Sequence, residues 1–347
     1  MWHTLKRWLD SLVTKSRGLV LRLIGRPLGR WVEGSYAESH HKLLYFLLPQ
    51  SRRHYHLYLP RRYSAERASP LVVMLHGCKQ DAAIFSSGTR MNQLADEEGF
   101  LVLYPEQRRL ANAHRCWNWF DASAHRAGGE AALIAGMVVE VTHTHAVDPA
   151  RVYVAGLSAG GAMTSIMASC YGHLFAACAV HSGLMYRAAE SVYEAMPAMK
   201  HGSRASPGAA ARQAAAQRDF VFVPAMVIHG STDSTVNPLN ADQVVEQFTA
   251  MSTFAGGASA PLTEFANRKS AGARFGYEVR DYRRGDRLLL RKVLVEGLGH
   301  AWSGGNGEHA FNDPQGPDAS RMIWEFFAGF RHSEQKTIAA AMVDRAM

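Results

Sequence analysis

Cysteine is scarce in this sequence, with four residues in a chain of 347. No two of them form a C-x-x-C pair, and this absence excludes the usual cysteine-based zinc sites. An even number permits two disulfide bonds in three connectivities. Because no export signal is recognisable, we expect the cysteines to be reduced and buried. The four are Cys78, Cys116, Cys170 and Cys178.

Long apolar runs are also missing, and none approaches the length of a membrane-spanning helix. No repeat occurs at the spacing of a solenoid or propeller. Hydrophobic residues nevertheless make up 47% of the chain and charged residues 20%. This composition allows a substantial core and excludes global disorder, and the length permits one large α/β domain or two small ones.

Acidic residues are nearly absent from the first 31 positions. This stretch holds seven basic residues against Asp10 alone, a local charge of +6 out of the total of +8. The rest of the molecule is therefore close to neutral. A general nucleic-acid-binding surface is not supported, and we expect no nucleic-acid partner.

The same stretch carries a broad apolar arc at helical spacing, and residues 1–35 are predicted to form a basic amphipathic segment. Residues 1–31 suit peripheral contact with an anionic membrane or an apolar polymer granule. The alternatives are a helix packed on the main domain and a frayed terminus. Arg17 and Arg22 interrupt the apolar core that a secretory signal needs, so a cytoplasmic location is favoured and a secreted or periplasmic one is the alternative.

Apolar segments alternate with helix-compatible segments along the main part of the chain. This alternation of strand and helix segments predicts an α/β fold, with a mainly parallel sheet and helices on both faces. Residues 276–283 and 287–295 are predicted as an antiparallel hairpin, whereas 185–219 are expected to be either a helical excursion over the site or a disordered loop. The other predicted strands are 54–59, 71–75, 100–104 (stopped by Pro105), 151–155, 175–180 and 224–228, and the predicted helices are 90–98, 130–145, 161–171, 240–252 and 318–330.

The most informative motif is Gly156-Leu157-Ser158-Ala159-Gly160, a G-x-S-x-G run. It follows the predicted strand 151–155 and precedes the predicted helix 161–171. A sharp turn between a strand and a helix exposes a serine oxygen, and glycines on both sides remove side chains that would clash there. The run predicts that Ser158 is a nucleophile, and the alternative is a structural serine in a tight turn.

A serine hydroxyl needs a histidine to take its proton and an acid to orient that histidine. In α/β-hydrolase sheets, these residues follow one another in the order serine, acid, histidine. Asp233 follows the predicted strand 224–228, and His300 follows a second predicted strand, so we predict a Ser158–His300–Asp233 triad. The lesser candidates for the acid are Glu296, Asp313 and Asp318.

Two backbone N–H groups are expected to form the oxyanion hole. One belongs to Ala159, directly after the nucleophile, and the other to Cys78, in the loop that leaves the strand 71–75. The alternative for this loop is a simple turn. A Cys78–Cys116 bond would make the site more rigid if the compartment is oxidising. We expect no metal and no organic cofactor.

Flat aromatic side chains near these segments are candidates for a substrate-binding wall, because such faces suit both aliphatic and aromatic acyl groups. The alternative is ordinary core filling. The candidates are Trp117, Trp119 and Trp302.

Taken together, these segments resemble the poly(3-hydroxybutyrate) depolymerase family of esterases, within the α/β-hydrolases. The resemblance covers about residues 55–330 and implies an α/β-hydrolase catalytic domain, expected here over 36–332 with a tail at 333–347. It also implies that Ser158, Asp233 and His300 form the triad and that Cys78 and Ala159 line the oxyanion hole. The matching segments are Leu75–Gln80, Cys116–Phe120, Gly156–Met163, His181–Gly183, His229–Asp233 and Gly299–Gly305.

The family includes polyester depolymerases and esterases that act on ferulate or acetyl groups of plant polysaccharides. We therefore expect a serine esterase for 3-hydroxyalkanoate polyester or oligomer esters, with a feruloyl or acetyl xylan-type carbohydrate esterase as the alternative. A non-catalytic surface-binding protein is the hypothesis from another class, and the intact serine, acid and histidine argue against it. No signal peptide or Thr-rich linker is recognisable, which argues against attack on crystalline extracellular polymer.

Overall fold

The computed structural model describes residues 29–37, 52–217, 219–255, 262–269 and 275–332. The predicted tail at 333–347 lies outside the described residues, as does the predicted amphipathic segment up to residue 28. Among the described residues, no helix has the length and apolar character needed to cross a membrane.

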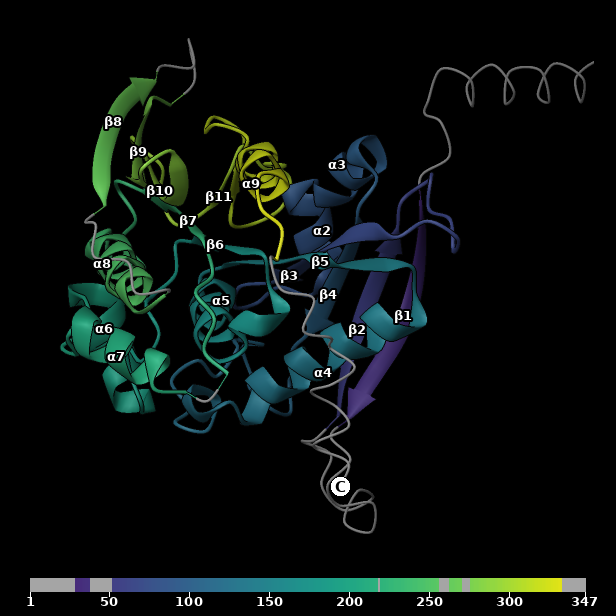
Figure 1. The fold of residues 1–347 in the computed structure, drawn as a ribbon, viewed down its shortest axis with the longest axis horizontal. Helices are drawn as coiled ribbons and strands as arrows, with labels where there is room; N and C mark the ends of the chain where they lie inside the picture. The colour runs from purple at the N-terminus through teal and green to yellow at the C-terminus, as the bar shows by residue number, and fades with distance from the viewer. Residues whose placement is uncertain (1–28, 38–51, 218, 256–261, 270–274, 333–347) are drawn as a thin grey trace, which may run out of the picture.

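A ten-stranded sheet forms the centre of the molecule, in the order β1-β2-β4-β3-β5-β6-β7-β10-β9-β8 (Figure 1). The six strands from β4 to β10 in this order run parallel, and antiparallel pairs extend the sheet at both ends. The strands are β1 (Arg30–Ala37), β2 (Arg52–Leu59), β3 (Ser69–Leu75), β4 (Leu101–Glu106), β5 (Val147–Leu157), β6 (Ala177–His181), β7 (Ala225–Gly230), β8 (Thr263–Lys269), β9 (Tyr277–Arg284) and β10 (Arg287–Val295). A small separate sheet pairs β11 (Trp302–Ser303) with β12 (Asn312–Asp313).

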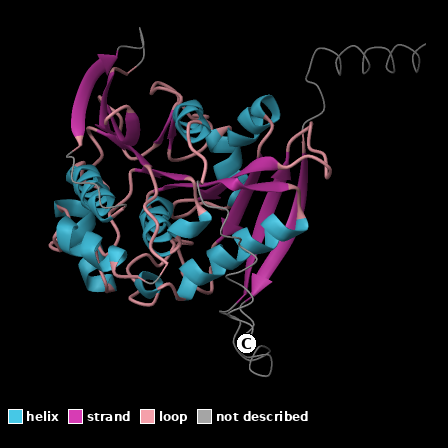
Figure 2. Cartoon of the chain, in the orientation of Figure 1, coloured by secondary structure: helices cyan, strands magenta, loops and turns pink. Residues whose placement is uncertain are grey.

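Helices cover both faces of the large sheet (Figures 1 and 2). One face carries α4 (Gly129–Thr144), α5 (Ala159–Cys170) and α8 (Leu239–Phe254), and the other carries α2 (Ala82–Thr89), α3 (Met91–Glu98) and α9 (Ala319–Ala328). Two further helices, α6 (Val192–His201) and α7 (Pro207–Ala215), pack against α8. Single 3-10 turns lie at Ala124–Arg126 and Gly172–Leu174.

The central strands are apolar because both of their faces are covered. In β5, Val152 and Val154 belong to the core beneath α4 and α5, whereas Tyr153 and Ala155 belong to the core beneath α9. Side chains alternate between the two faces of a strand, so one continuous apolar run supplies both cores. The mainly parallel sheet with helices on both faces and the predicted hairpin are confirmed.

Several boundaries differ from the prediction. The strand β4 continues through Pro105 to Glu106, because its parallel pairing with β3 ends at Leu103 and the missing proline N–H breaks no bond on that side. The expected boundary at residue 35 falls inside β1, which pairs along its length with β2. Residues 185–219 contain two helices rather than a disordered loop, and α2, β1 and β8 were not expected.

Candidate active site

Ser158 occupies the turn between β5 and α5, with φ 58° and ψ −119°. A positive φ is costly for a residue with a side chain, so the surrounding packing must enforce it. Side chains at the flanking positions would clash, since a Cβ on Gly156 would lie 2.3 Å from the Gly160 oxygen and one on Gly160 would lie 2.0 Å from the Leu75 oxygen. The two glycines of the motif therefore allow the helix to approach the sheet closely enough to hold the serine in this conformation.

The structure brings together the three predicted triad side chains from three different loops. The His300 Nε2 atom lies 2.9 Å from Ser158 Oγ, and His300 Nδ1 lies 2.7 Å from Asp233 Oδ2. An ionised carboxylate only accepts hydrogen bonds, so Nδ1 carries the imidazole proton and Nε2 accepts from the serine hydroxyl. This arrangement can pass the serine proton to the imidazole.

Asp233 is buried at the start of the loop that follows β7. Its Oδ1 accepts hydrogen bonds from the N–H groups of Thr235 and Val236, both at 2.9 Å. Burial alone would raise the pKa of Asp233, but the hydrogen bond from His300 and these contacts lower it below the ordinary value. The carboxylate therefore stays ionised and keeps the His300 imidazole in one orientation.

Two of the other candidate acids, Asp313 and Asp318, have different roles. Asp318 caps α9, where its side chain accepts from Arg321 N at 3.0 Å. Asp313 accepts from Gln315 N at 2.8 Å within its own turn. The carboxylate at His300 is thus that of Asp233.

The loop after β3 lies directly beside the serine, because a Cβ on Gly77 would be 3.5 Å from Ser158 Cβ. Most of its N–H groups are occupied: Gly77 N donates to Gln80 Oε1 at 2.8 Å, Lys79 N to His114 O at 2.7 Å, and Gln80 N to Gly77 O at 3.4 Å. Within the described part of the chain, the Cys78 N–H donates to no other residue, and neither does the Ala159 N–H. These are the two groups predicted for the oxyanion hole.

The expectation that all four cysteines are reduced is wrong. Cys78 and Cys116 form a disulfide bond across a separation of 38 residues, with their Cα atoms 4.2 Å apart. The two loops follow the neighbouring parallel strands β3 and β4 and meet at the same edge of the sheet, which brings cysteines distant in sequence together. Cys170 and Cys178 are buried free thiols.

The predicted tryptophan wall is also wrong. Trp117 and Trp302 are completely buried, and Trp119 is only 4% exposed, so none of them offers an accessible face. Trp302 stacks on His181 with ring centroids 4.9 Å apart, and Trp117 packs beside His76 at 5.5 Å. All three tryptophans fill the core, which is the alternative that the sequence left open, and Trp117 and Trp302 also support buried histidines.

The structure places a different aromatic side chain beside the reacting groups. Phe311 is partly buried and approaches the His300 ring edge-on at 6.4 Å, with a backbone φ of 63°. The backbone of this loop is held by His181, whose Nε2 accepts from Ser303 N at 3.1 Å. Burial lowers the pKa of His181 to about 3, so the ring stays neutral and can accept. The loop has no hydrophobic periodicity, so the sequence offered no signal for Phe311.

Among the described residues, no group of three or more His, Cys, Asp or Glu side chains has the arrangement of a metal site.

Known proteins resemble this chain in sequence and fold. Poly(3-hydroxyalkanoate) depolymerase C of Paucimonas lemoignei is 40% identical over 185 residues, which cover 52% of this chain and 44% of the depolymerase, so the chain spans less than half of that relative. Feruloyl esterase B of Thermothelomyces thermophilus is 30% identical over 259 residues, covering 71% of this chain and 82% of the esterase. In fold, the chain is similar to the acetyl xylan esterase from Aspergillus awamori, with a TM-score of 0.65 and 22% identity over 86% of this chain and 99% of that one.

Residues 53–267 match the family described as Esterase PHB depolymerase. This match covers more than half of the chain and includes the strand-turn-helix around Ser158 and the loop that carries Asp233. The sheet order and the helices on both faces agree with the α/β-hydrolase fold. The chain therefore belongs to the Esterase PHB depolymerase family of carboxylic ester hydrolases.

Proposed function

We propose that the protein hydrolyses carboxylic esters through an acyl-enzyme on Ser158. The observation that carries this proposal is the continuous hydrogen-bonded chain from Ser158 through His300 to Asp233. A buried serine in a strained turn with an imidazole at hydrogen-bond distance fits the geometry of an activated nucleophile.

In the first half of the reaction, Ser158 Oγ attacks the ester carbonyl carbon and its proton passes to His300 Nε2. Asp233 accepts the Nδ1–H hydrogen bond and stabilises the imidazolium that forms. The N–H groups of Cys78 and Ala159 hold the negative oxygen of the tetrahedral intermediate. His300 then returns the proton to the leaving alcohol, and the acyl group remains on the serine.

In the second half, water takes the place of the alcohol. His300 accepts a proton from the water, whose oxygen attacks the acyl carbon, and the same N–H groups hold the second oxyanion. Collapse of this intermediate returns the proton to Ser158 Oγ and releases the carboxylic acid.

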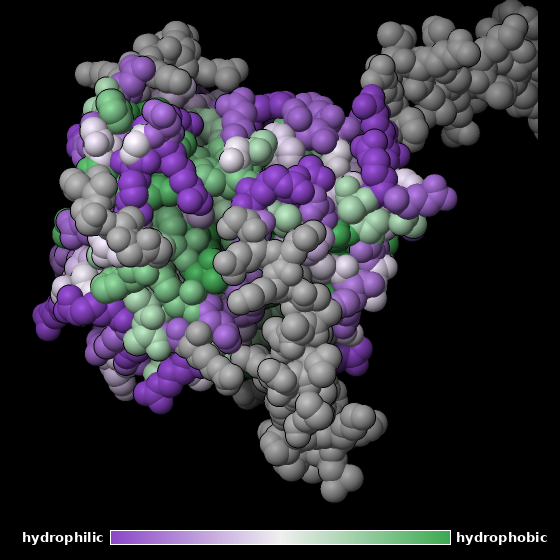
Figure 3. Space-filling model, viewed as in Figure 1, coloured by the Kyte–Doolittle hydropathy of each residue, from purple (hydrophilic) through white to green (hydrophobic). Residues whose placement is uncertain are grey.

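For the substrate, we propose 3-hydroxyalkanoate esters of the polyester or oligomer type. The 40% identity with a poly(3-hydroxyalkanoate) depolymerase supports this choice. So does an exposed apolar face on α6, formed by Val192, Tyr193 and Met196. The end of α6 contacts the loop that carries Asp233, since Asn237 N donates to Met199 O at 2.8 Å. Figure 3 shows further hydrophobic surface around the position of α8.

A feruloyl or acetyl xylan-type esterase is the second candidate. The observation that favours it is the similarity to feruloyl esterase B, which extends over 71% of this chain and 82% of that esterase. A partly exposed aromatic ring at Phe311, beside His300, suits a planar feruloyl group as well as an aliphatic acyl chain.

A substrate panel tests both the reaction and the substrate class. We expect the highest kcat/KM on soluble 3-hydroxybutyrate oligomers and lower values on methyl ferulate and acetylated xylan. The Ser158→Ala variant should lose activity on every ester by at least about 10⁴-fold, because the nucleophile is absent. A higher kcat/KM on ferulate or acetylated xylan would reverse the substrate assignment, and full activity of Ser158→Ala would overturn the mechanism.

A further inference from the structure

The orientation of the Cys78 N–H is determined by a neighbouring carbonyl. A peptide unit is planar, and in the trans form its C=O and N–H point in opposite directions. The Gly77 C=O and the Cys78 N–H belong to the same unit. A contact that holds the Gly77 oxygen therefore also aims the N–H that the proposed mechanism needs.

His76 makes this contact. Its Nδ1 lies 2.8 Å from Gly77 O, and its Nε2 lies 3.1 Å from the backbone N of Gln107. The backbone N–H is always a donor, so Nε2 accepts, and Nδ1 carries the proton and donates to Gly77 O. The ring is almost completely buried beside Trp117, and this burial lowers its pKa and keeps it neutral.

The side chain of Gln107 supports the second of the two loops that the disulfide bond joins, the loop after β4. Its Nε2 donates to Cys116 O at 3.0 Å, and Cys116 is joined to Cys78 by the disulfide bond. Gln107 therefore acts on the Gly77–Cys78 peptide unit indirectly, by two routes: its backbone N–H supports His76, and its side chain supports Cys116.

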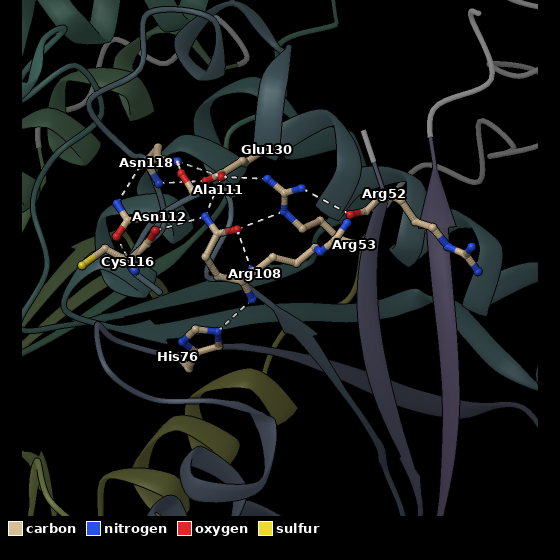
Figure 4. Close-up of polar contacts among 10 residues, drawn as sticks. Arg52, Arg53, His76, Arg108, Ala111, Asn112, Cys116, Asn118 and Glu130 are labelled. Carbon is tan, nitrogen blue, oxygen red and sulfur yellow. Dashed lines mark hydrogen bonds and ion pairs between the residues drawn. The ribbon is translucent and has the colours of Figure 1, made fainter. Parts of the chain in front are cut away.

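A buried ion pair fixes the side chain of Gln107 in turn. Its Oε1 accepts from Arg53 Nε at 2.9 Å and its Nε2 also donates to Glu130 Oε1, while Arg53 and Glu130 pair at 3.1 Å. The Glu130 carboxylate also accepts from the N–H and the side-chain amide of Asn118. Figure 4 shows Arg53, Glu130 and Asn118 converging above His76. A fully satisfied buried network of this kind is rigid.

We infer that His76 and Gln107 are positioning residues that aim the Cys78 N–H at the developing oxyanion. This inference rests on the proposed function. Neither side chain is required to touch the substrate. Their effect is therefore expected on the tetrahedral intermediate, where the oxygen is negative, more than on the bound ester.

The experiment compares an oxo ester with the corresponding thiono ester, in which sulfur replaces the carbonyl oxygen. A donor pair placed for an oxyanion stabilises the bulkier sulfur poorly, so the wild type should strongly prefer the oxo ester. In His76→Leu, we expect kcat on the oxo ester to fall by about 10- to 100-fold with KM within about twofold. The ratio of the oxo to the thiono kcat/KM should fall in parallel.

Two further variants separate positioning from general damage. His76→Asn keeps a side-chain N–H near the place of Nδ1, so it should restore most of the rate and of the oxo preference. His125→Leu is the matched control, because His125 is another buried histidine whose Nε2 contacts a backbone carbonyl, that of Ala189 at 2.9 Å. It should lower Tm and leave the ratio unchanged.

If His76→Leu does not fold, Gln107→Leu provides the test, because it removes the contact with Cys116 O while its backbone N–H still supports His76. In Gln107→Leu, the ratio of the oxo to the thiono kcat/KM should fall, but by a smaller factor than in His76→Leu. An unchanged ratio in a folded His76→Leu, or in Gln107→Leu, would overturn the inference. A wild-type protein without esterase activity would instead overturn the proposed function.

Discussion

Ser158 concentrates strain and reactivity in one residue. Its positive φ turns the hydroxyl toward His300, and α5 begins at the next residue, so the first N–H groups of the helix lie behind the serine. Helix N-termini favour negative charge, which here would be the oxyanion. The cost of the strained backbone, about 1–3 kcal/mol, is offset by the packing around it.

Replacing Asp233 with asparagine should stop catalysis without unfolding the protein. The new side-chain amide would donate to His300 Nδ1, so the imidazole proton would move to Nε2 and face the serine. The ring could then no longer accept the serine proton, and kcat should fall by about 10⁴-fold. The side-chain oxygen still accepts from Thr235 and Val236 N–H, so Tm should change little. A kcat within tenfold of the wild type would contradict this role for Asp233.

The three triad positions were predictable because each follows an apolar run that predicts a strand, and because their order along the chain is restricted. The substrate wall was not predictable in the same way. Aromatic character does not say whether a ring is exposed: Trp302 is completely buried, whereas Phe311 lies beside His300. Burial at these positions depends on how the loop after β10 folds back over the sheet.

At the scale of elements, the close contact of α5 with β3 positions the site. The helix begins so near the strand that the Leu75 oxygen occupies the space of a side chain at Gly160. The helix N-terminus, the serine and the loop after β3 are therefore brought to one point. No residue larger than glycine fits at position 160 without moving the helix.

Two Gly→Ala substitutions should have effects of opposite sign. Gly160→Ala should destabilise the fold by about 3 kcal/mol or more, because its Cβ would lie 2.0 Å from the Leu75 oxygen. Gly208→Ala, within α7, meets its nearest atoms at 3.8 and 3.9 Å and should stabilise by about 0.5–1 kcal/mol. Urea unfolding measures both changes. Equal tolerance of the two substitutions would contradict the close helix–strand contact.

Elements with both faces buried were predictable, and those at the edges were not. The strand β3 is buried throughout, and its residues Leu71–Leu75 form the continuous apolar run that predicted it. By contrast, β1 and β8 lie at the two edges of the sheet, and exposed residues break up their pattern. The helix α2 has eight residues, including a glycine and two serines, so its helical signal is weak.

At the scale of the whole molecule, the helical layers on the sheet exclude water from several histidines. Burial lowers the pKa of His76, His125, His181 and His229, to about 3 for His181. These rings are therefore neutral in the folded protein at neutral pH. The α/β architecture was predictable from the alternation of elements, but the Cys78–Cys116 bond depends on which loops meet in space.

Stability should fall as the solution becomes acidic. The unfolded chain binds protons on these histidines at about pH 6.5, whereas the folded chain binds them only at lower pH. The stabilisation is fully present above about pH 6.5 and is lost as pH falls toward the lowered folded values. Each such group contributes a slope of at most about 1.4 kcal/mol per pH unit. The lowered pKa of Asp233 acts in the same direction at still lower pH.

Thermal unfolding between pH 8 and pH 4 measures this effect. Tm should be nearly constant above pH 7 and fall progressively below it. In His181→Gln, the fall should be shallower, because one buried titrating ring is gone, although Tm itself is lower at neutral pH. A Tm that stays constant down to pH 4 would contradict the neutral state of the buried rings.

The most direct test of the account is the site of modification by a fluorophosphonate, a reagent that phosphonylates activated serines. Intact mass and peptide mapping should find one adduct per chain, on Ser158, with no adduct in Ser158→Ala and much slower labelling in His300→Ala. An adduct on another residue, or equal labelling of Ser158→Ala, would contradict the conclusion that Ser158, His300 and Asp233 act together on an ester.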